Sequence, residues 1–386
     1  NNFTESFWKE GRDVWILDMR TSPGLPSARY PWTFEQVAGV DIPIAIDYIR
    51  RQYAEGRQVD VLAHCMGAVM FSMAALNPDY IIDTSNRHLR RYFGEAACDA
   101  TGFKSGFFEE RVRAVIFSQV TPTVVFSPDN KLRAYLMQYL KELIPDGYQF
   151  RPETPSLADD LIDRLLYTLP YPENEFDIEN PPWHPCKRTG FTRTRHRMDA
   201  LYGRDFNLQN VDEKVLEHID DLFGPMSIDT VAQTIHFARL DTIATKGGHN
   251  LFVTEENLQN WRFPTCGFHG EENGLADVVT AERTGQIFEN ATNAPLIKVS
   301  LKQDQPPINS RYLKLRTSHH GHQDSLIGRS AHENVFQDLK TFLDAVDKRE
   351  ERPQEPVMVG STQKGGPTWS KAFIDIASAT AKEASP

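Results

Sequence analysis

The stretch Val59-Asp60-Val61-Leu62-Ala63-His64-Cys65-Met66-Gly67-Ala68 is an apolar, β-branched run that leads into a short turn and then into small, helix-forming residues. A nucleophile held in a sharp strand-to-helix turn requires small residues two positions before and two positions after it, because larger side chains would clash. Ala63 and Gly67 occupy those two positions around Cys65. We therefore predict a nucleophile elbow in which cysteine takes the place of the usual serine.

The segments on either side of Cys65 support this interpretation. Residues 59–64 are apolar enough for a strand that is buried on both faces of a parallel sheet. A helix over residues 67–76 would direct its N-terminal amides at the sulfur and favour the thiolate. The alternative is that Cys65 is an inert thiol that packs like a small hydrophobic residue.

The overall composition restricts the classes of function. The chain has 386 residues, which is enough for one large α/β domain with insertions or for two smaller domains. Its net charge of −11 argues against nucleic acid or an anionic membrane surface as the main partner. No apolar run approaches the roughly 20 residues of a membrane-spanning helix. The overall amino-acid composition is typical of a soluble globular protein.

The cysteines and the first residues bear on the cellular compartment. Cys65, Cys98, Cys186 and Cys266 show no close CxxC spacing, so neither a disulfide framework nor a zinc ribbon is indicated. We expect a reducing compartment and a cytoplasmic protein. The chain begins at Asn1 without an initiator methionine or a signal-peptide pattern, which suggests a truncated or processed start.

The first third of the chain alternates between helical and strand patterns. Short amphipathic helix 3–12 is followed by a predicted buried strand over 13–18, and helix 34–53 should be kinked at Pro43. The elbow strand comes next, and residues 77–110 resemble a polar, irregular insertion before a strand over 112–118. This order predicts a mostly parallel sheet with right-handed crossovers, the architecture of an α/β protein.

Helical periodicity replaces the strand pattern over residues 129–260. Insertions concentrate in loops at the carboxyl edge of such sheets, so we interpret this block as a helical cap over the active-site face. An independent helical domain is the alternative. Further elements are expected at 263–270 (strand), 278–288 (helix), 312–316 (strand) and 331–346 (helix). The resulting division is 1–128 and 261–347 for the two parts of the core, 129–260 for the cap and 348–386 for a polar tail.

A nucleophile elbow, an acid-type loop after a later strand and a histidine after the last strand follow the chain order of the α/β-hydrolases. Over residues 5–347 the sequence resembles the α/β-hydrolase unit that is fused to, or encoded with, GMC-type (cholesterol-oxidase-like) flavin oxidoreductases. The resemblance is carried by Gly11-Arg12-Asp13-Val14-Trp15-Ile16-Leu17-Asp18-Met19-Arg20, Ala63-His64-Cys65-Met66-Gly67, Gly270-Glu271-Glu272-Asn273 and Gly321-His322-Gln323-Asp324.

Residues 270–277 also resemble, more distantly, the acid loop of the acid lipases. That likeness places the catalytic aspartate position at Asn273. A cysteine nucleophile can work with an asparagine that only orients the histidine, as in papain-like sites, so cysteine and asparagine form a consistent pair. Glu272 and Asp277 remain alternative orienting residues.

The resemblance assigns the general base to His322, in the turn after the final strand, with His320 as the alternative. Residues 319, 320 and 322 are all histidines, but they lie on a loop with no evident cysteine or carboxylate ligands, so we expect no metal. His184, Cys186 and His196 form a second, weak metal candidate. No glycine-rich dinucleotide motif follows a strand, and we expect no flavin or other cofactor.

An oxyanion hole in this fold uses the amide of the residue after the nucleophile, which here is Met66, and an amide that follows an earlier strand. That earlier strand is not visible in the sequence. We therefore expect that part of the site is supplied by an N-terminal fragment of the same polypeptide.

These residues predict a hydrolase that cleaves an ester, thioester or lactone of a hydrophobic substrate through an acyl-cysteine. The esterase- or lipase-like triad would consist of Cys65, His322 and Asn273. One alternative is an acyltransferase that uses the same acyl-cysteine, as polyhydroxyalkanoate synthases, which the elbow resembles, do. The other is a non-catalytic module that partners a GMC flavin oxidoreductase.

Overall fold

A parallel sheet forms the centre of the molecule. The computed structural model describes residues 2–22, 25–54, 56–143, 156–166, 203–218, 228–301 and 306–349. Four parallel strands lie in the order β1-β2-β3-β6, and they are β1 (Val59–His64), β2 (Val112–Ser118), β3 (Thr265–Gly270) and β6 (Tyr312–Thr317). The strands expected over 112–118, 263–270 and 312–316, and the elbow strand, are thus confirmed to within two residues.

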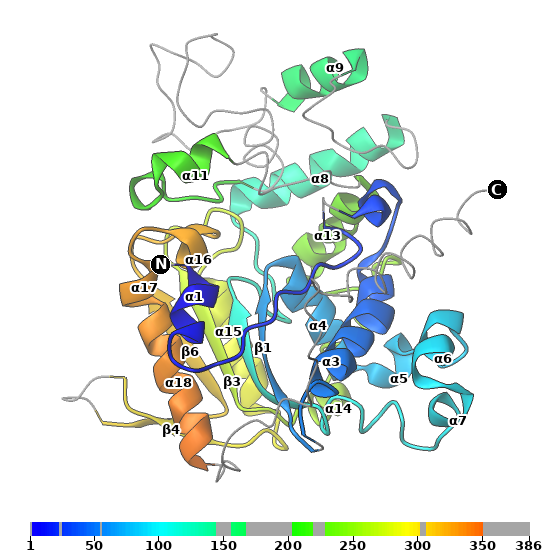
Figure 1. The fold of residues 1–386 in the computed structure, drawn as a ribbon. Coiled ribbons are helices and arrows are strands. Elements are labelled where there is room, and N and C mark those ends of the chain that lie inside the picture. Colours follow the sequence, from blue (N-terminus) through cyan, green and yellow to red (C-terminus); the bar gives the residue numbers. More distant parts are fainter. Residues whose placement is uncertain are drawn as a thin grey trace, which may run out of the picture.

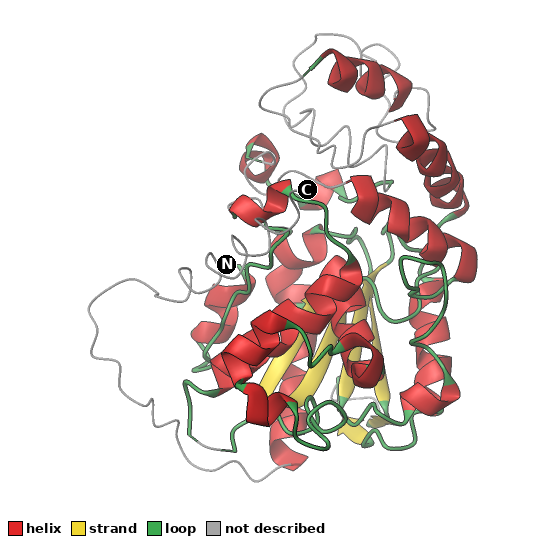
Figure 2. Cartoon of the chain, turned by 90° about the vertical axis from the view of Figure 1, so that its right-hand side faces the viewer, coloured by secondary structure: helices red, strands yellow, loops and turns green. Residues whose placement is uncertain are grey.

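Helices cover both faces of this sheet (Figures 1 and 2). The helices are α1 (Phe3–Trp8), α2 (Phe34–Gln36), α3 (Ile42–Arg50), α4 (Met66–Leu76), α5 (Pro78–Ile81), α6 (Arg87–Phe93), α7 (Glu95–Cys98), α8 (Pro128–Leu143), α9 (Leu157–Leu166), α11 (Glu213–Glu217), α13 (Ile228–Leu240), α14 (Glu255–Leu258), α15 (Val279–Glu289), α16 (Asp324–Ile327), α17 (Ala331–Asn334) and α18 (Phe336–Arg349). Short 3₁₀ turns lie at Pro26–Arg29 and Leu208–Asn210.

The alternation of side chains along β2 builds two hydrophobic cores. Val115 and Phe117 join a core with α3, α4, α13 and Trp261, whereas Ala114 and Ile116 join a second core with α1 and α18. Successive residues of a strand point to opposite faces, so a continuous apolar run such as this one serves both layers.

Residues 13–18 do not form the predicted buried strand. The segment is extended and is held by side chains, since Trp15 donates from Nε1 to the Tyr53 hydroxyl at 2.8 Å. Trp15 and Ile16 remain 37% and 66% exposed. The segment is apolar, as the pattern indicated. A strand forms only where a neighbouring strand exchanges backbone hydrogen bonds with it, and no described strand lies beside residues 13–18.

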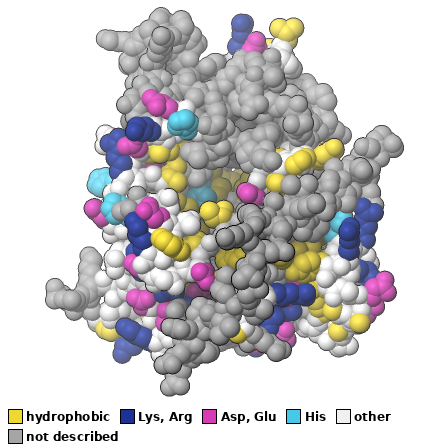
Figure 3. Space-filling model, in the orientation of Figure 1, with side chains coloured by type: hydrophobic (Ala, Val, Ile, Leu, Met, Phe, Trp, Pro, Cys, Tyr) yellow, Lys and Arg dark blue, Asp and Glu magenta, His cyan; other side chains and the backbone are white. Residues whose placement is uncertain are grey.

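The position of β1 corrects a second expectation. Because β1 borders only β2 among the described strands, it is an edge strand, and most of its residues are only partly buried. The prediction of burial on both faces is therefore wrong for β1, although it holds for β3, which is buried throughout. Figure 3 shows hydrophobic side chains at the surface in the middle of this face of the molecule.

The helix predicted over 34–53 contains a π turn at Val37–Asp41, immediately before Pro43. Proline lacks a backbone N–H and its ring crowds the carbonyl four residues earlier, and a wider turn relieves both problems. Pro43 consequently lies in the first turn of α3. The interruption was predicted at the right place, and its form is a π turn.

Residues 77–110 are only partly irregular. α5, α6 and α7 occupy much of residues 78–98, and turns follow as far as β2. Phe93 of α6 packs edge to face against Phe103 and Phe107 of these turns, and Phe107 packs in the same way against Phe108. Phe107 and Phe108 are 1% and 3% exposed, so this segment is part of the core.

The described part of the 129–260 block contains α8, α9, α11, α13 and α14. Figure 1 shows α8, α9 and α11 beyond the carboxyl ends of the strands, where a cap was expected. Phe237 of α13 and residues Phe252 and Trp261 pack in the same core as α3 and α4. The weak metal candidate His184, Cys186 and His196 lies outside the described residues, as does most of the predicted tail.

The last third contains a feature that the sequence patterns did not indicate. β4 (Ile297–Val299) and β5 (Ile308–Ser310) form a separate antiparallel pair. The helix expected over 278–288 is α15, and the one expected over 331–346 is divided into α17 and α18.

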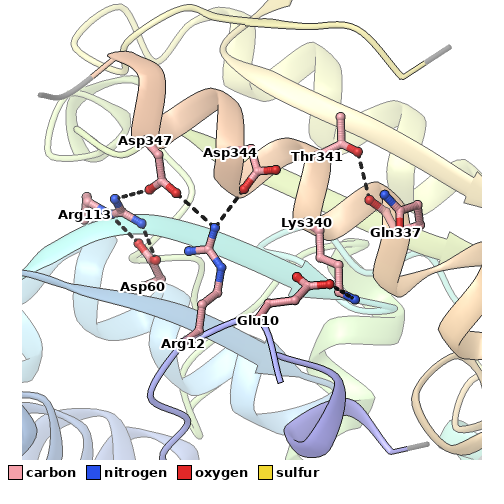
Figure 4. Close-up of polar contacts among 9 residues, drawn as sticks. All are labelled: Glu10, Arg12, Asp60, Arg113, Gln337, Lys340, Thr341, Asp344 and Asp347. Carbon is pink, nitrogen blue, oxygen red and sulfur yellow. Dashed lines mark hydrogen bonds and ion pairs between the residues drawn. The ribbon is translucent and has the colours of Figure 1, made fainter. Parts of the chain in front are cut away.

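Charged side chains tie the N-terminal segment and two strands to α18 (Figure 4). Arg113 of β2 donates from Nε to Asp60 of β1 at 2.7 Å and from its terminal nitrogen to Asp347 at 2.6 Å. Arg12 donates to Asp344 and Asp347, both at 3.0 Å. The two carboxylates beside Arg113 raise its pKa despite its partial burial. This network fixes the amino ends of β1 and β2 against α18.

Tyr312, which is buried against two glycines, provides a test of this packing. A Cβ added at Gly267 of β3 would overlap the Tyr312 hydroxyl, whereas one added at Gly285 of α15 would lie at an ordinary 3.8 Å from the ring. Gly267→Ala should therefore cost about 1–3 kcal/mol by overpacking. Gly285→Ala should stabilise by about 0.5–1 kcal/mol, since alanine favours a helix. Urea unfolding of both variants checks the opposite signs, and equal effects would contradict the packing described.

Candidate active site

The turn that follows β1 places Cys65 at the carboxyl edge of the sheet. Cys65 has φ 50° and ψ −120°, a conformation that non-glycine residues rarely adopt. Its backbone N–H donates to the Ser118 carbonyl at 3.2 Å, and its own carbonyl accepts the N–H groups of Ala68 and Val69 at the start of α4. This is the strained strand-to-helix turn that the sequence predicted at this position.

The two small residues around the elbow have different surroundings. Ala63 is 6% exposed and belongs to the core, as expected for a residue that must be small. A Cβ on Gly67 would meet no described atom within 4 Å beyond its own helix and chain neighbours. The clash that was expected to require a small residue is therefore not present at Gly67 within the described part of the chain.

His322 lies in the loop after β6, next to His64, the residue that precedes Cys65. Its side chain is fully buried, and its ring centroid is 5.1 Å from that of His64. Neither ring nitrogen of His322 has a hydrogen-bond partner among the described atoms. Burial lowers the pKa of His322 well below its ordinary value, and His64 and His269 lower it further. The imidazole is therefore neutral at physiological pH and retains a lone pair that can accept a proton.

His64 is held on both sides. Its Nδ1 lies 2.7 Å from the Ser118 hydroxyl and its Nε2 lies 2.9 Å from Gln323 Oε1. Because an amide oxygen can only accept, Nε2 carries the proton and Nδ1 accepts from Ser118. Burial lowers the pKa of His64 to about 4, although the bond with Gln323 opposes the shift. His64 thus links the elbow to the His322 turn as a neutral side chain.

The expected thiolate is not favoured at Cys65. Burial raises the pKa of the Cys65 thiol to about 12, the negative charge of Asp205 raises it further, and only the hydrogen bond from the Met66 amide opposes these effects. The helix N-terminus was expected to dominate, but desolvation and a nearby anion outweigh it. At neutral pH the thiol of Cys65 is therefore protonated and the imidazole of His322 is neutral.

Asn273 lies in the turn after β3, where the sequence placed the acid loop. Its Nδ2 donates to Gln119 Oε1 at 3.1 Å, and its Oδ1 accepts the N–H groups of Leu275 and Ala276. The structure therefore shows Asn273 bonded to Gln119 and its own loop, with no hydrogen bond to His322.

Gln119 joins three of the loops at this edge, and the sequence reasoning missed it. It has φ 69° at the end of β2 and is fully buried. Its Oε1 also accepts the Gly270 N–H at 2.9 Å, and its Nε2 donates to the Ser325 hydroxyl at 2.7 Å. A polar residue directly after a buried strand was the available signal, because such residues lie at the carboxyl edge where ligands bind in open α/β sheets.

The alternative orienting residues face other partners. Glu272 lies 3.6 Å from Arg204 and 3.4 Å from the exposed His319. Asp277 accepts the Val279 N–H at the start of α15. In the described structure neither carboxylate is hydrogen bonded to a ring nitrogen of His322.

The loop after β6 contains two further histidines, His319 and His320. His320 was the alternative base, and both belonged to the metal site that was considered and not expected. The His320 ring lies between the Ser318 carbonyl at 2.7 Å and the Ser330 hydroxyl at 3.2 Å, so its nitrogens are used by its own loop. His319 points outward and is almost fully exposed. No group of three histidine, cysteine or acidic side chains among the described residues is arranged to hold a metal ion.

Residues 203–210 lie against the His322 turn. The Asp205 carbonyl accepts the N–H groups of His322 and Gln323 at 2.8 and 2.9 Å. The buried Asp324 carboxylate accepts the amides of Gly321 and Asn207 and the side chain of Asn210 at 2.9 to 3.0 Å. Sequence reasoning assigned this segment to the cap and missed Asp205, because no local pattern reveals which distant loop will cover a site.

The described ranges contain no helix of the length and apolar character needed to cross a membrane. No model of a known protein family matches the chain, and no curated protein matches it.

The fold of the chain was compared with solved structures, and two of the similar ones are an esterase and an acetyltransferase. One is a thermophilic esterase from Thermogutta terrifontis, at 13% identity and a TM-score of 0.34, with 84% of this chain and 74% of that chain covered. The other is a homoserine O-acetyltransferase from Bacillus anthracis, at 12% identity and a TM-score of 0.34, with 84% of this chain and 66% of that chain covered. Similarities of this size say nothing about the reaction or the substrate.

The class of fold is defined by the chain's own geometry. A parallel sheet carries helices on both faces, a strained strand-to-helix turn at Cys65 follows β1, and a buried histidine follows β6 at the same edge. This arrangement is the α/β-hydrolase fold.

The neutral histidines of this site make the stability depend on pH. His64 and His269 have pKa values of about 4 in the folded protein, against about 6.5 when unfolded, and the pKa of His322 is also lowered. As the pH falls below about 6.5, the unfolded chain takes up protons first, so the free energy of unfolding decreases by about 1.4 kcal/mol per pH unit for each histidine. Above about pH 6.5 these histidines are neutral in both states, and their contribution to the free energy of unfolding no longer changes with pH.

Urea unfolding between pH 7.5 and 5 measures this slope. His64→Gln should reduce this slope by about 1.4 kcal/mol per pH unit. An identical slope in wild type and His64→Gln would show that His64 is not held neutral by the fold.

Proposed function

We propose that this protein is a hydrolase that cleaves an ester-type bond of a hydrophobic substrate through an acyl-cysteine at Cys65. The observation that carries the proposal is the strained elbow at Cys65, with φ 50°. Strain of this kind persists where the surrounding structure imposes it, and it is concentrated at functional sites. The protein would thus belong to the esterase- or lipase-like enzymes of the α/β-hydrolase fold.

The protonation states define the first step. The thiol is protonated and His322 is neutral, so His322 accepts the thiol proton as the sulfur attacks the carbonyl carbon. The carbonyl oxygen becomes an oxyanion, and the Met66 N–H is the donor next to the nucleophile that can bind it. His322 then returns the proton to the leaving oxygen or sulfur as the carbon–oxygen or carbon–sulfur bond breaks, which leaves a thioester on Cys65.

The second step releases the acid. A water molecule gives a proton to His322 and attacks the thioester carbonyl, and the thiol recovers the proton as it leaves. A histidine held neutral serves this cycle, since it must accept a proton twice. Orientation of its ring by Asn273, as the sequence suggested, requires Asn273 to exchange its bond with Gln119 for one with His322.

Intact mass after brief exposure to p-nitrophenyl butyrate tests the proposal. We expect one butyryl group on the wild-type chain and none on Cys65→Ala treated in the same way. Cys98→Ala is the matched control, because Cys98 is a buried thiol of α7 and that variant should be labelled like wild type. Absence of the adduct from wild type, or its persistence in Cys65→Ala, would overturn the nucleophile assignment.

The fate of the acyl group separates hydrolysis from transfer. With and without an added alcohol, we expect butyric acid as the main product. A butyrate ester of the alcohol as the main product would replace hydrolysis by acyl transfer at the same cysteine.

A further inference from the structure

We propose that Gln119 is a positioning residue of this site, whose side chain fixes the loop that carries His322 relative to the strand-to-helix turn at Cys65. Gln119 itself takes no part in bond making. Its effect on catalysis rests on the proposed function, whereas the bridge through which it acts is present whatever reaction the protein catalyses.

The turn after β3 and the loop after β6 pack together as one unit. The Glu272 N–H donates to the His320 carbonyl at 3.0 Å. A Cβ on Gly270 would overlap the carbonyl oxygens of His320 and Gly321, so no side chain fits between the two segments. The loop that carries His322 is therefore placed together with the turn after β3.

Cys65 follows β1, at the far side of the sheet from β6. The strand order β1-β2-β3-β6 separates β1 from β6 by three strand spacings, roughly 14 Å. The ring centroid of His322 nevertheless lies 5.1 Å from that of His64. The loop after β6 therefore reaches back across the carboxyl ends of β3 and β2, and the position of the base depends on what holds the loop there.

Gln119 holds this loop from the end of β2. Its Nε2 donates to the Ser325 hydroxyl at 2.7 Å, and that hydroxyl donates at 2.9 Å to the carbonyl of Gly321, the residue before the base. Its Oε1 accepts the N–H of Gly270 at 2.9 Å and the side-chain amide of Asn273 at 3.1 Å. One buried amide thus ties both parts of the unit to β2.

The backbone of Gln119 is strained. It has φ 69°, and the Val120 N–H donates across it to the Ser118 carbonyl at 2.8 Å. These features are those of a γ-turn with positive φ, which is rare and strained. Glycine adopts positive φ without steric cost, so a residue that only made this turn would be glycine. A fully buried glutamine in its place indicates that the position requires the side chain.

A second bridge to the same loop starts from the neighbouring residue. Ser118 lies 2.7 Å from His64 Nδ1, and His64 Nε2 lies 2.9 Å from Gln323 Oε1. The end of β2 therefore reaches the loop of the base at two points, residues 323 and 325. Of the two bridges, the one through Gln119 also holds the turn after β3.

Gln119→Met keeps the length of the side chain and removes its hydrogen bonds. Per folded molecule, kcat for p-nitrophenyl butyrate should fall about 10- to 100-fold, because a displacement of the base by about 1 Å can cost that much. KM should stay within about twofold, since the buried side chain is out of reach of a substrate. Urea unfolding gives the folded fraction. An unchanged kcat, or a higher one from an Asn273 released toward His322, would overturn the proposal.

Ser325→Ala removes the same bridge from its other end and leaves Gly270 and Asn273 bonded to Gln119. We expect kcat to fall at least about threefold. The double variant should be within about twofold of Gln119→Met, because both substitutions remove one bond. Effects that multiply would overturn the bridge. If Gln119→Met does not fold, Ser325→Ala decides alone, and an unchanged kcat would overturn the proposal.

Gln259→Met is the matched control. The amide of Gln259 also joins two turns, through the Asn290 carbonyl at 2.9 Å and the Thr292 hydroxyl at 2.6 Å, but it lies before the amino end of β3. This variant should leave kcat unchanged. An equal loss of kcat would show a general loosening of the fold and would overturn the proposal.

Hydrogen exchange separates this proposal from the hydrolase itself. In Gln119→Met the amides of residues 317–330 should exchange about 3- to 10-fold faster than in wild type, the effect of losing one hydrogen bond, and in Gln259→Met they should not. Faster exchange without any acyl adduct on wild type would support the bridge and reject the hydrolase. An acyl adduct on wild type, with exchange and kcat unchanged in Gln119→Met, would support the hydrolase and reject the role of Gln119.

Discussion

Replacing Cys65 by alanine is expected to reduce kcat/KM for p-nitrophenyl butyrate by about 10⁴- to 10⁶-fold, to the background rate. The reason is that the remaining groups, His322 and the Met66 amide, can polarise water and the carbonyl but cannot form the acyl intermediate. The variant should stay folded, with a free energy of unfolding within about 1 kcal/mol of wild type, because the substitution removes only the sulfur atom. Steady-state kinetics and urea unfolding of the same preparation check both statements.

Cys65→Ser refines this prediction. If the thiol reacts only as its proton passes to neutral His322, a serine hydroxyl can use the same base, and residual activity well above that of Cys65→Ala is expected. A serine variant as inactive as the alanine variant would contradict attack assisted by His322 and would favour a preformed thiolate. Such a result would also conflict with the raised pKa of Cys65.

Replacing His322 by glutamine should have the second-largest effect. Without the base the thiol remains protonated, and kcat/KM should fall by about 10²- to 10⁴-fold. Because burial and two neighbouring histidines lower the pKa of His322, the wild-type kcat/KM should stay level from pH 8 down to the acid side of the ordinary histidine pKa of about 6.5. A decline centred on pH 6.5 would contradict the neutral, buried state of this side chain.

His320→Gln is the control for that experiment. His320 is also fully buried, but its ring nitrogens bind Ser318 and Ser330, so its replacement should affect stability more than chemistry. If His320→Gln lowered kcat/KM more than His322→Gln did at equal folded fraction, the base would be His320.

The fold could be read from the sequence where the pattern is local and continuous. The run ending in Cys65, the apolar residues 112–118 and the strand before Gly270 carry enough hydrophobic signal to be recognised alone. The same signal was misleading at residues 13–18, because an apolar run becomes a strand only beside another strand. It also missed α5, α6 and α7 and the burial of Phe107 and Phe108 in the turns that follow them.

The residues of the candidate site also fall into those with a local sequence signal and those without one. Cys65 and His322 were proposed because the first follows a strand in a turn of recognisable sequence and the resemblance places the second in the loop after the last strand, and the structure brings their neighbourhood together at one edge of the sheet. Gln119 and Asp205 were not, since their importance comes from the loops that they contact, 100 residues and more away along the chain. Asn273 lies in the turn after β3, but its hydrogen bonds to Gln119 and to its own turn depend on neighbours that no spacing rule describes.

The sequence by itself determined that a cysteine would occupy a strand-to-helix turn in an α/β chain, because strand, small residues and helix are encoded within ten consecutive positions. The tertiary structure alone decided the ionisation of that cysteine. Sequence reasoning about the helix N-terminus predicted a thiolate, whereas burial and the charge of Asp205 keep the thiol protonated. The physical reason is that a pKa depends on solvation and on all nearby charges, which are brought together only when distant segments pack.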